Sequence, residues 1–240
     1  MKLTLLMENN TLYCNYYHGE HGFSAYIEDE GKKILYDTGY SGAFIKNAED
    51  MGIDLTAIDY MIVSHGHLDH GGGVKHLVQY YKEKGVTRKP VALLTSPEAF
   101  CPKYDFNIKQ DQGMGIELEP VQQFFDVRFV TEPFNLTSNL IYLGSVPRAN
   151  SFECKTPQAP KKLKDGVWVD DYVPEDTQLA YRHKNGKEVS VITGCSHNGI
   201  CNIIEYAKQV AGVDRVDTVI GGLHLQNPSK ELMASTLDYV

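Results

Sequence analysis

The sequence feature that most restricts the fold lies between residues 60 and 73, which read YMIVSHGHLDHGGG. An apolar run typical of a buried strand leads directly into His65, His67, Asp69 and His70, and three glycines follow them. In open α/β sheets, ligand-binding residues gather in loops at the carboxyl ends of strands. The pattern therefore predicts a strand, a polar loop and a helix within an α/β protein.

The side chains of this loop are good metal ligands. Imidazole and carboxylate groups in this mixture suit zinc best, with manganese and iron as lesser alternatives. Alternate residues of an extended turn point the same way, so His65 and His67 are expected to share one ion while Asp69 and His70 face another. The alternative is a solvated loop rich in histidine by chance, but nine histidines in 240 residues seldom concentrate in this way. We therefore predict a metal site.

Hydrophobic patterning places further elements on both sides of the loop. Strand-like runs are expected at 2–7, 23–28 and 32–37, and helical spacing at 42–52. The runs 60–64, 71–85 and 90–95 form a β-α-β unit, for which parallel pairing is expected. Later, Asn185-Gly186 marks a hairpin within 178–193, and a helix at 199–212, a strand at 216–222 and a helix after Pro228 follow.

The length of 240 residues and the hydrophobic content of 42% predict one domain, residues 1–240, with a core of ordinary size. Residues 96–180 contain most of the prolines and little periodicity. They contain only short strand candidates, at 127–131 and 139–144. We therefore predict that 96–180 is a loop-rich insertion over one end of the core.

Charge and composition exclude several classes of partner. A net charge of −8 without a Lys/Arg-rich run argues against nucleic acid. The apolar run at the N-terminus is too short for the hydrophobic region of a secretory signal. No apolar run approaches the roughly 18 residues of a membrane span. Five cysteines without a CxxC pair fit reduced thiols. We expect a cytoplasmic protein with a small-molecule substrate and no membrane partner; its oligomeric state is left open.

The order of the motifs resembles the metallo-β-lactamase superfamily. His-x-His-x-Asp-His after a strand is similar to the signature of that superfamily, and YDTG with Asp37 resembles its first motif, whose aspartate supports the metal loop. TGCSH at 193–197 and GGLH at 221–224 follow in order. The resemblance spans nearly the whole chain and implies an αββα sandwich with one or two metal ions at its edge. His67, where the diiron flavoprotein branch has glutamate, favours zinc, and we expect two ions.

Four further stretches are similar to one branch of this superfamily, which is named for 7,8-dihydropterin-6-methyl-4-(β-D-ribofuranosyl)-aminobenzene-5′-phosphate synthase. They read GEHGFSAYIE, GSVPRANSFE, VITGCSHNGI and VIGGLHL. The resemblance implies an enzyme that joins a pterin methyl diphosphate to an aminobenzene ribose phosphate, or a relative of that enzyme with another activity.

The sequence departs from the superfamily pattern at two motifs. The usual third-motif Gly-His pair is Gly144-Ser145, so His197 is expected to replace the missing histidine. Cys195 stands where the fourth motif has aspartate, and it is either a thiolate ligand or a small buried residue. The last ligand is His224 or, alternatively, a histidine that follows the C-terminal helix.

Three residues are expected to act on the substrate. Asp69 is the expected catalytic residue, because it can bind metal and orient a water molecule. His21 is expected at the substrate mouth and Arg148, with Lys103, at a phosphate group, although each could equally be a solvated surface residue.

Three functions remain open from the sequence. The first is a zinc-dependent hydrolase of a small phosphorylated or ester substrate, and the second is the pterin-joining transferase. The third is a metal-binding sensor or scaffold without catalysis. Paired metal ions suit both chemistries, because they can assist attack by water or neutralise a departing diphosphate.

Overall fold

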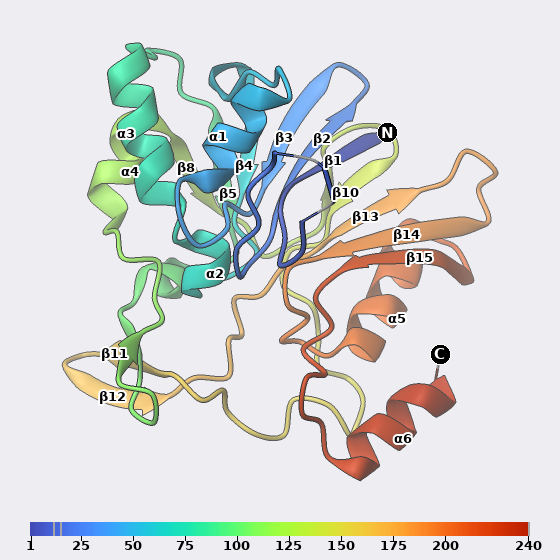
Figure 1. Ribbon diagram of the computed structural model, residues 1–240. Helices are drawn as coiled ribbons and strands as arrows, with labels where there is room; N and C mark the ends of the chain where they lie inside the picture. Colours follow the sequence, from blue (N-terminus) through green and yellow to red (C-terminus); the bar gives the residue numbers. More distant parts are fainter. Residues whose placement is uncertain (12, 15, 240) are drawn as a thin grey trace.

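Two β-sheets lie face to face at the centre of the protein, in a computed structural model that describes residues 1–11, 13–14 and 16–239 (Figure 1). The first sheet has six strands in the order β1-β2-β3-β4-β5-β8. Their bounds are Lys2–Met7, Ser24–Asp29, Lys32–Tyr36, Tyr60–Ile62, Val91–Leu94 and Asp126–Phe129. The strands β1 to β3 pair antiparallel, and β3, β4, β5 and β8 pair parallel.

The second sheet has five strands in the order β15-β14-β13-β10-β9. Their bounds are Arg215–Gly221, Glu188–Thr193, Leu179–Arg182, Leu140–Tyr142 and Phe134–Asn135. Only β14 and β15 pair parallel, so their carboxyl ends lie at the same edge. The predicted hairpin at Asn185-Gly186 is confirmed as the connection between β13 and β14.

The inner faces of the two sheets share one hydrophobic core. The first sheet contributes residues such as Ile27, Ile34 and Tyr36, which are completely buried. Leu140 and Ile192 of the second sheet pack against them. The alternation of apolar residues along these strands is what directs one face of each sheet into this contact.

Helices cover the outer faces of both sheets, as Figure 1 shows for α1, α3 and α4 on one side and α5 on the other. The bounds are Ala43–Asp50 for α1, Val74–Lys84 for α3, Leu118–Phe124 for α4 and Ile200–Ala211 for α5. The remaining helices are α2 (Leu68–Gly71), α6 (Lys230–Tyr239) and the 3₁₀ turns η1 (Leu55–Ala57) and η2 (Pro97–Phe100). The predicted αββα sandwich is confirmed, and so is parallel pairing of β4 with β5 around α3.

The prediction that 96–180 is an insertion over the core is wrong for its central part. The helix α4 and the strands β8, β9 and β10 belong to the sandwich itself, and β8 forms the edge of the first sheet. Outside the sandwich lies a small sheet of order β12-β11-β6-β7, with the bounds Val167–Asp170, Lys161–Lys164, Lys103–Asp105 and Gln110–Asp111. The strand candidates at 127–131 and 139–144 correspond to β8 and β10, and they were too short to assign to a sheet from local pattern alone.

The small sheet carries an aromatic cluster. The ring centroid of Trp168 lies 5.6 Å from that of Phe106 and 6.1 Å from that of Tyr104. Lys103 anchors this sheet to the rest of the protein, because its buried ammonium group donates to Asp171 and Glu175.

Among the described residues, no helix is both long and apolar enough to cross a lipid bilayer.

Candidate metal centre

Loops from both sheets meet at one edge of the sandwich. His65 follows β4 of the first sheet, whereas His197 follows β14 and His224 follows β15 of the second. The ring centroids of His65 and His197 lie 4.6 Å apart, and those of His197 and His224 lie 4.5 Å apart. The structure therefore brings together side chains that are separated by more than half of the sequence.

Three histidines from these loops, His65, His67 and His197, form one compact group. One ring nitrogen each of His65, His67 and His197 lie within 4.8 Å of one another. The Nε2 atoms of His65 and His197 are only 3.2 Å apart. Within the described part of the chain, Nε2 of His67 and Nδ1 of His197 are buried without a hydrogen-bond partner. Because an unpaired buried nitrogen is costly, Nε2 of His67 fits a metal ion well, and so do the facing Nε2 atoms of His65 and His197.

Other donors lie directly beside this group. Cys195 shares one set of closely spaced donors with His65 and His70, and another with His197 and His224. The Oδ2 atom of Asp69 lies 3.6 Å from Nε2 of His70. Cys195 is half-buried, and in each of the two sets its sulfur lies within 4.8 Å of the ring nitrogens.

Asp37 orients two of the histidines. Its carboxylate accepts hydrogen bonds from the backbone N–H of Ser64 at 2.6 Å and from the Ser64 hydroxyl at 2.7 Å. It also accepts from Nδ1 of His70 at 2.7 Å. Since the Ser64 hydroxyl donates to Asp37, its oxygen accepts from Nδ1 of His65 at 2.9 Å. In its neutral form, each of His65 and His70 therefore has an Nε2 atom that is without a proton and available to a metal ion.

Burial keeps most of these imidazoles neutral. It lowers the pKa of His67 to about 3 and holds the pKa values of His65 and His197 well below the ordinary value. Burial also lowers the pKa of His224. For His70, burial acts in the same direction, but the neighbouring Cys195 and carboxylates outweigh it and raise the pKa. Neutral imidazole is the form that binds metal, so the environment favours ligands over cations.

Asp69 and His21 lie where the site is open to solvent, with 19% of the Asp69 side chain exposed. Burial alone would raise the pKa of Asp69, but the neighbouring His70 and His21 hold it well below its ordinary value. Nε2 of His21 lies 3.2 Å from Oδ2 of Asp69, and the His21 side chain is 72% exposed. Gly22, with φ of +125°, permits this approach, since a Cβ there would lie 2.1 Å from the Asp69 carbonyl oxygen.

The structure gives Arg148 and Lys103 different surroundings from those predicted. The guanidinium of Arg148 donates to the Asn198 side chain at 2.9 Å and to the backbone carbonyls of Tyr172 and Val173. These contacts bind it to protein groups and do not support a role in phosphate binding. The prediction for Lys103 is wrong, because this side chain is fully buried in its ion pairs with two carboxylates.

The sequence patterns did not single out Ser64, Asp176 or Asn198, which surround the histidines. Asp176 is fully buried, and burial raises its pKa to about 8. Its Oδ1 atom lies 3.7 Å from Nδ1 of His65. The only local signal was the polar run EDTQ directly before the apolar residues of β13.

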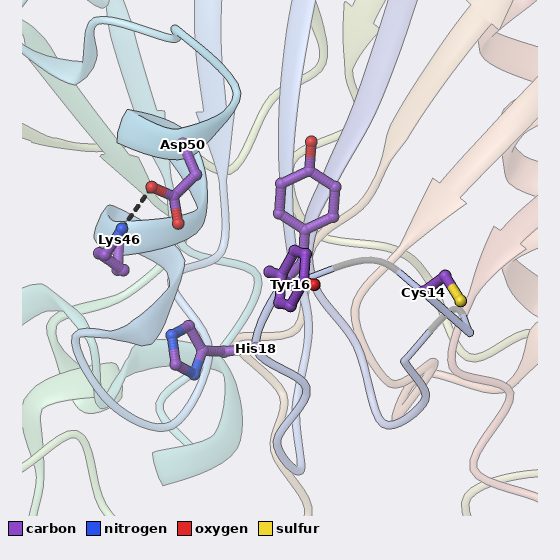
Figure 2. Close-up of a pocket in the computed structure, with 6 residues that line it drawn as sticks. Cys14, Tyr16, His18, Lys46 and Asp50 are labelled. Atoms are coloured by element: carbon purple, nitrogen blue, oxygen red, sulfur yellow. Dashed lines mark hydrogen bonds and ion pairs between the residues drawn. The ribbon is translucent and has the colours of Figure 1, made fainter.

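A cavity of about 520 Å³ lies elsewhere, between α1 on one side and Cys14 and residues 16–18 on the other (Figure 2). Lys46 and Asp50 form an ion pair on α1, and His18 lies below them in the view. The residues that line this cavity include none of the histidines described above. The candidate functional site is therefore the histidine group and not this cavity.

Comparison with known proteins agrees with the motifs. The sequence profile of the Metallo-beta-lactamase superfamily matches residues 19–143. The chain is 30% identical to the uncharacterized protein MJ0448 of Methanocaldococcus jannaschii, over 98% of this chain and 84% of that protein.

A second relative from the same organism is the 7,8-dihydropterin-6-methyl-4-(beta-D-ribofuranosyl)-aminobenzene-5′-phosphate synthase, which is 29% identical over 99% of this chain and 82% of its own length. Among solved structures, Tm1679, a metal-dependent hydrolase of the beta-lactamase superfamily, superposes with a TM-score of 0.76 at 28% identity. That match covers 99% of this chain and 82% of Tm1679. From its profile match and its nearly full-length relatives, the chain belongs to the metallo-β-lactamase superfamily.

Proposed function

We propose that this protein is a zinc-dependent hydrolase that binds two metal ions and acts on a small phosphorylated or ester substrate. The observation that carries the proposal is the grouping of His65, His67 and His197, whose ligand atoms lie within 4.8 Å of one another at the edge where the two sheets meet.

The donors divide into two sets. His65, His67 and His197 would hold one ion. Asp69, His70 and His224 would hold the second, and Cys195 lies between the two sets because it belongs to a close group with members of each. Five imidazoles, one carboxylate and one thiol form a donor set that suits zinc better than magnesium or calcium, which prefer oxygen ligands.

Each residue at the opening then has a distinct task. Zinc ions bound here would supply Lewis-acid activation of the substrate and of the attacking nucleophile. Asp69 keeps an ionised oxygen at the opening, where it can accept a hydrogen bond from the nucleophile and hold its orientation. His21, in contact with that oxygen and largely exposed, is placed to donate a hydrogen bond to the substrate.

A phosphate-bearing substrate is favoured over a β-lactam. The name of the synthase relative describes a product that contains a 5′-phosphate. Paired divalent ions bind phosphoryl oxygens well. We expect turnover of bis-p-nitrophenyl phosphate with zinc or manganese and negligible hydrolysis of a chromogenic cephalosporin. Cephalosporin hydrolysis without phosphodiester turnover would reverse this assignment.

The turnover assay is combined with metal analysis of the purified protein and of two histidine variants. The purified protein should contain one to two transition-metal ions per chain, and His67→Ala should lose both metal and phosphodiester turnover. His76→Ala, an exposed histidine on α3, should change neither. A folded wild type with less than about 0.2 equivalents of any transition metal would contradict the proposal.

A pterin-joining transferase is the second candidate, because the synthase relative matches 99% of this chain. In that reaction the ions would neutralise a departing diphosphate rather than assist hydrolysis. Release of diphosphate from a pterin methyl diphosphate only when the aminobenzene ribose phosphate is present would favour this candidate. Metal binding without turnover of any of these substrates would instead favour a non-catalytic sensor.

A further inference from the structure

Four consecutive polar residues, Glu175, Asp176, Thr177 and Gln178, pass between the two sheets beneath the metal centre. The exposed fraction of each is 2% or less. Within the described part of the chain, each also has one buried side-chain oxygen without a hydrogen-bond partner. Burying a polar strip in this way costs free energy, so it calls for a functional explanation.

The backbone of this strip joins the first sheet to the second. The N–H of Thr177 donates to the carbonyl of Ser64 at 2.9 Å, and the Tyr36 hydroxyl donates to the carbonyl of Thr177 at 2.9 Å. On the other side, the N–H of Leu143 donates to the carbonyl of Gln178 at 3.0 Å. The strip is therefore fixed to Ser64, the residue before His65, and to the second sheet at once.

Asp176 makes the contacts closest to the histidines. Its Oδ2 atom accepts from the Gln178 side chain at 2.7 Å and from the backbone N–H of Asn198 at 3.3 Å. Its carbonyl oxygen accepts from Nδ2 of Asn198 at 2.6 Å. Its remaining oxygen, Oδ1, is buried without a hydrogen-bond partner and lies 3.7 Å from Nδ1 of His65. Asn198 directly follows His197, so Asp176 touches both metal-binding loops.

Arg148 supports the same arrangement from outside. Its Nε atom donates to Oδ1 of Asn198, and its terminal nitrogen donates to the carbonyls of Tyr172 and Val173. Asn198 is thus held between Arg148 and Asp176. This accounts for the placement of an arginine that the sequence alone suggested for substrate binding.

We propose that Asp176 is a positioning residue that sets the distance between His65 and His197. Its Oδ1 atom faces the first histidine, and through Asn198 it fixes the loop of the second. The inference rests on the proposed function, because it concerns the metal that these histidines would bind. Its role is to hold the two Nε2 atoms close enough to share one ion.

The experiment measures metal affinity and the visible spectrum of the cobalt-loaded protein, not turnover. Asp176→Asn keeps the shape and an acceptor for Asn198, but it turns an amide N–H towards Nδ1 of His65. The affinity for the first ion, measured by competition with a chelator, should fall on the order of tenfold or more, as for other residues that orient metal ligands. The cobalt absorption bands should also shift.

Two further variants make the result decisive. Asp171→Asn is the matched control, since Asp171 is equally buried but is bound by Lys103, Lys162 and the N–H of Val173. It should leave metal affinity unchanged even if it lowers stability. Asn198→Asp keeps the acceptor for Arg148 and removes the donor to Asp176, so it should also weaken metal binding.

Unchanged affinity and spectrum in Asp176→Asn would overturn the inference, and so would an equal loss in Asp171→Asn. If Asp176→Asn does not fold, the Asn198→Asp variant decides, and unchanged affinity there overturns the inference. A wild-type protein that binds no metal would contradict the proposed function instead, so the two failures are distinguishable.

Discussion

At the scale of single residues, Asp37 shows how one carboxylate can serve two imidazoles. It binds His70 directly and reaches His65 through the Ser64 hydroxyl, with every distance between 2.6 and 2.9 Å. The two histidines belong to different proposed ligand sets. A single buried side chain therefore fixes the tautomer of one ligand in each set.

His67 gives a testable dependence of stability on pH. Burial lowers its pKa from 6.5 to about 3, so on acidification the unfolded chain binds a proton before the native protein does. Native stability is therefore lost as pH falls below 6.5, by about 1.4 kcal/mol per pH unit from this group alone. Relative to His67→Asn, the metal-free wild type should lose unfolding free energy between pH 7 and pH 5.

Urea denaturation in the presence of a chelator measures this difference at each pH. Comparing wild type with the variant cancels the opposite contributions of His70 and Asp176, whose pKa values are raised. A difference between the two proteins that does not change with pH, or that changes in the wild type's favour on acidification, would contradict the expected ionisation of His67.

At the scale of elements, the start of α5 depends on a distant carboxylate. Glu153 is buried and accepts hydrogen bonds from the backbone N–H groups of Cys201 at 3.0 Å and Asn202 at 2.9 Å. These are among the first N–H groups of a helix, which have no partner within the helix itself. A negative charge is favoured at this end of the helix dipole.

Glu153→Gln should therefore destabilise the protein by about 1 kcal/mol, because the charge is lost while one acceptor remains. Glu83→Gln, on the exposed surface of α3, is the control and should have no measurable effect. The free energy of unfolding from urea titration checks both variants. Equal effects in the two would show that Glu153 contributes nothing particular to α5.

Helices and strands with a clear hydrophobic period could be predicted from sequence. The sheet to which a short strand belongs often could not. The run YMIVS and the helix after it were recognisable because their burial follows directly from apolar spacing. The strand β8 has four residues, none of them fully buried, so only its pairing with β5 reveals its place. Local pattern does not contain that information.

The candidate metal centre shows the same division between what local sequence does and does not predict. His65 to His70 were identified by their density in the sequence, and His197 by its place after an apolar strand. Asp176 could not be recognised, because a polar run before a strand ordinarily predicts a solvated loop. Its burial depends on Ser64 and Asn198, which come from distant parts of the chain.

At the scale of the whole molecule, the proposed metal site joins the two sheets. His65 and His67 belong to the first sheet's loops, whereas His197 and His224 belong to the second's. The unfolded chain does not bring these residues together, so a metal ion at the proposed site would bind the native state in preference. Ligand binding to the native state alone stabilises it by mass action.

Adding zinc to metal-free protein at a hundred times its Kd should therefore raise the free energy of unfolding by about 2.7 kcal/mol. Differential scanning fluorimetry with a graded zinc series, and a chelator to reverse it, measures the shift. His197→Ala should lose most of the gain and His76→Ala should keep it. A gain that persists in His197→Ala would place the stabilising ion elsewhere.

The small sheet gives the molecule an optical label of its own. Trp168 is the one tryptophan in the sequence, and it is 37% exposed in contact with Phe106. Its fluorescence therefore reports on the environment of β12. Absorption by cobalt bound at the histidines would report on the proposed metal site. Measurements at two wavelengths on one sample can thus show whether the small sheet and the proposed metal site respond together.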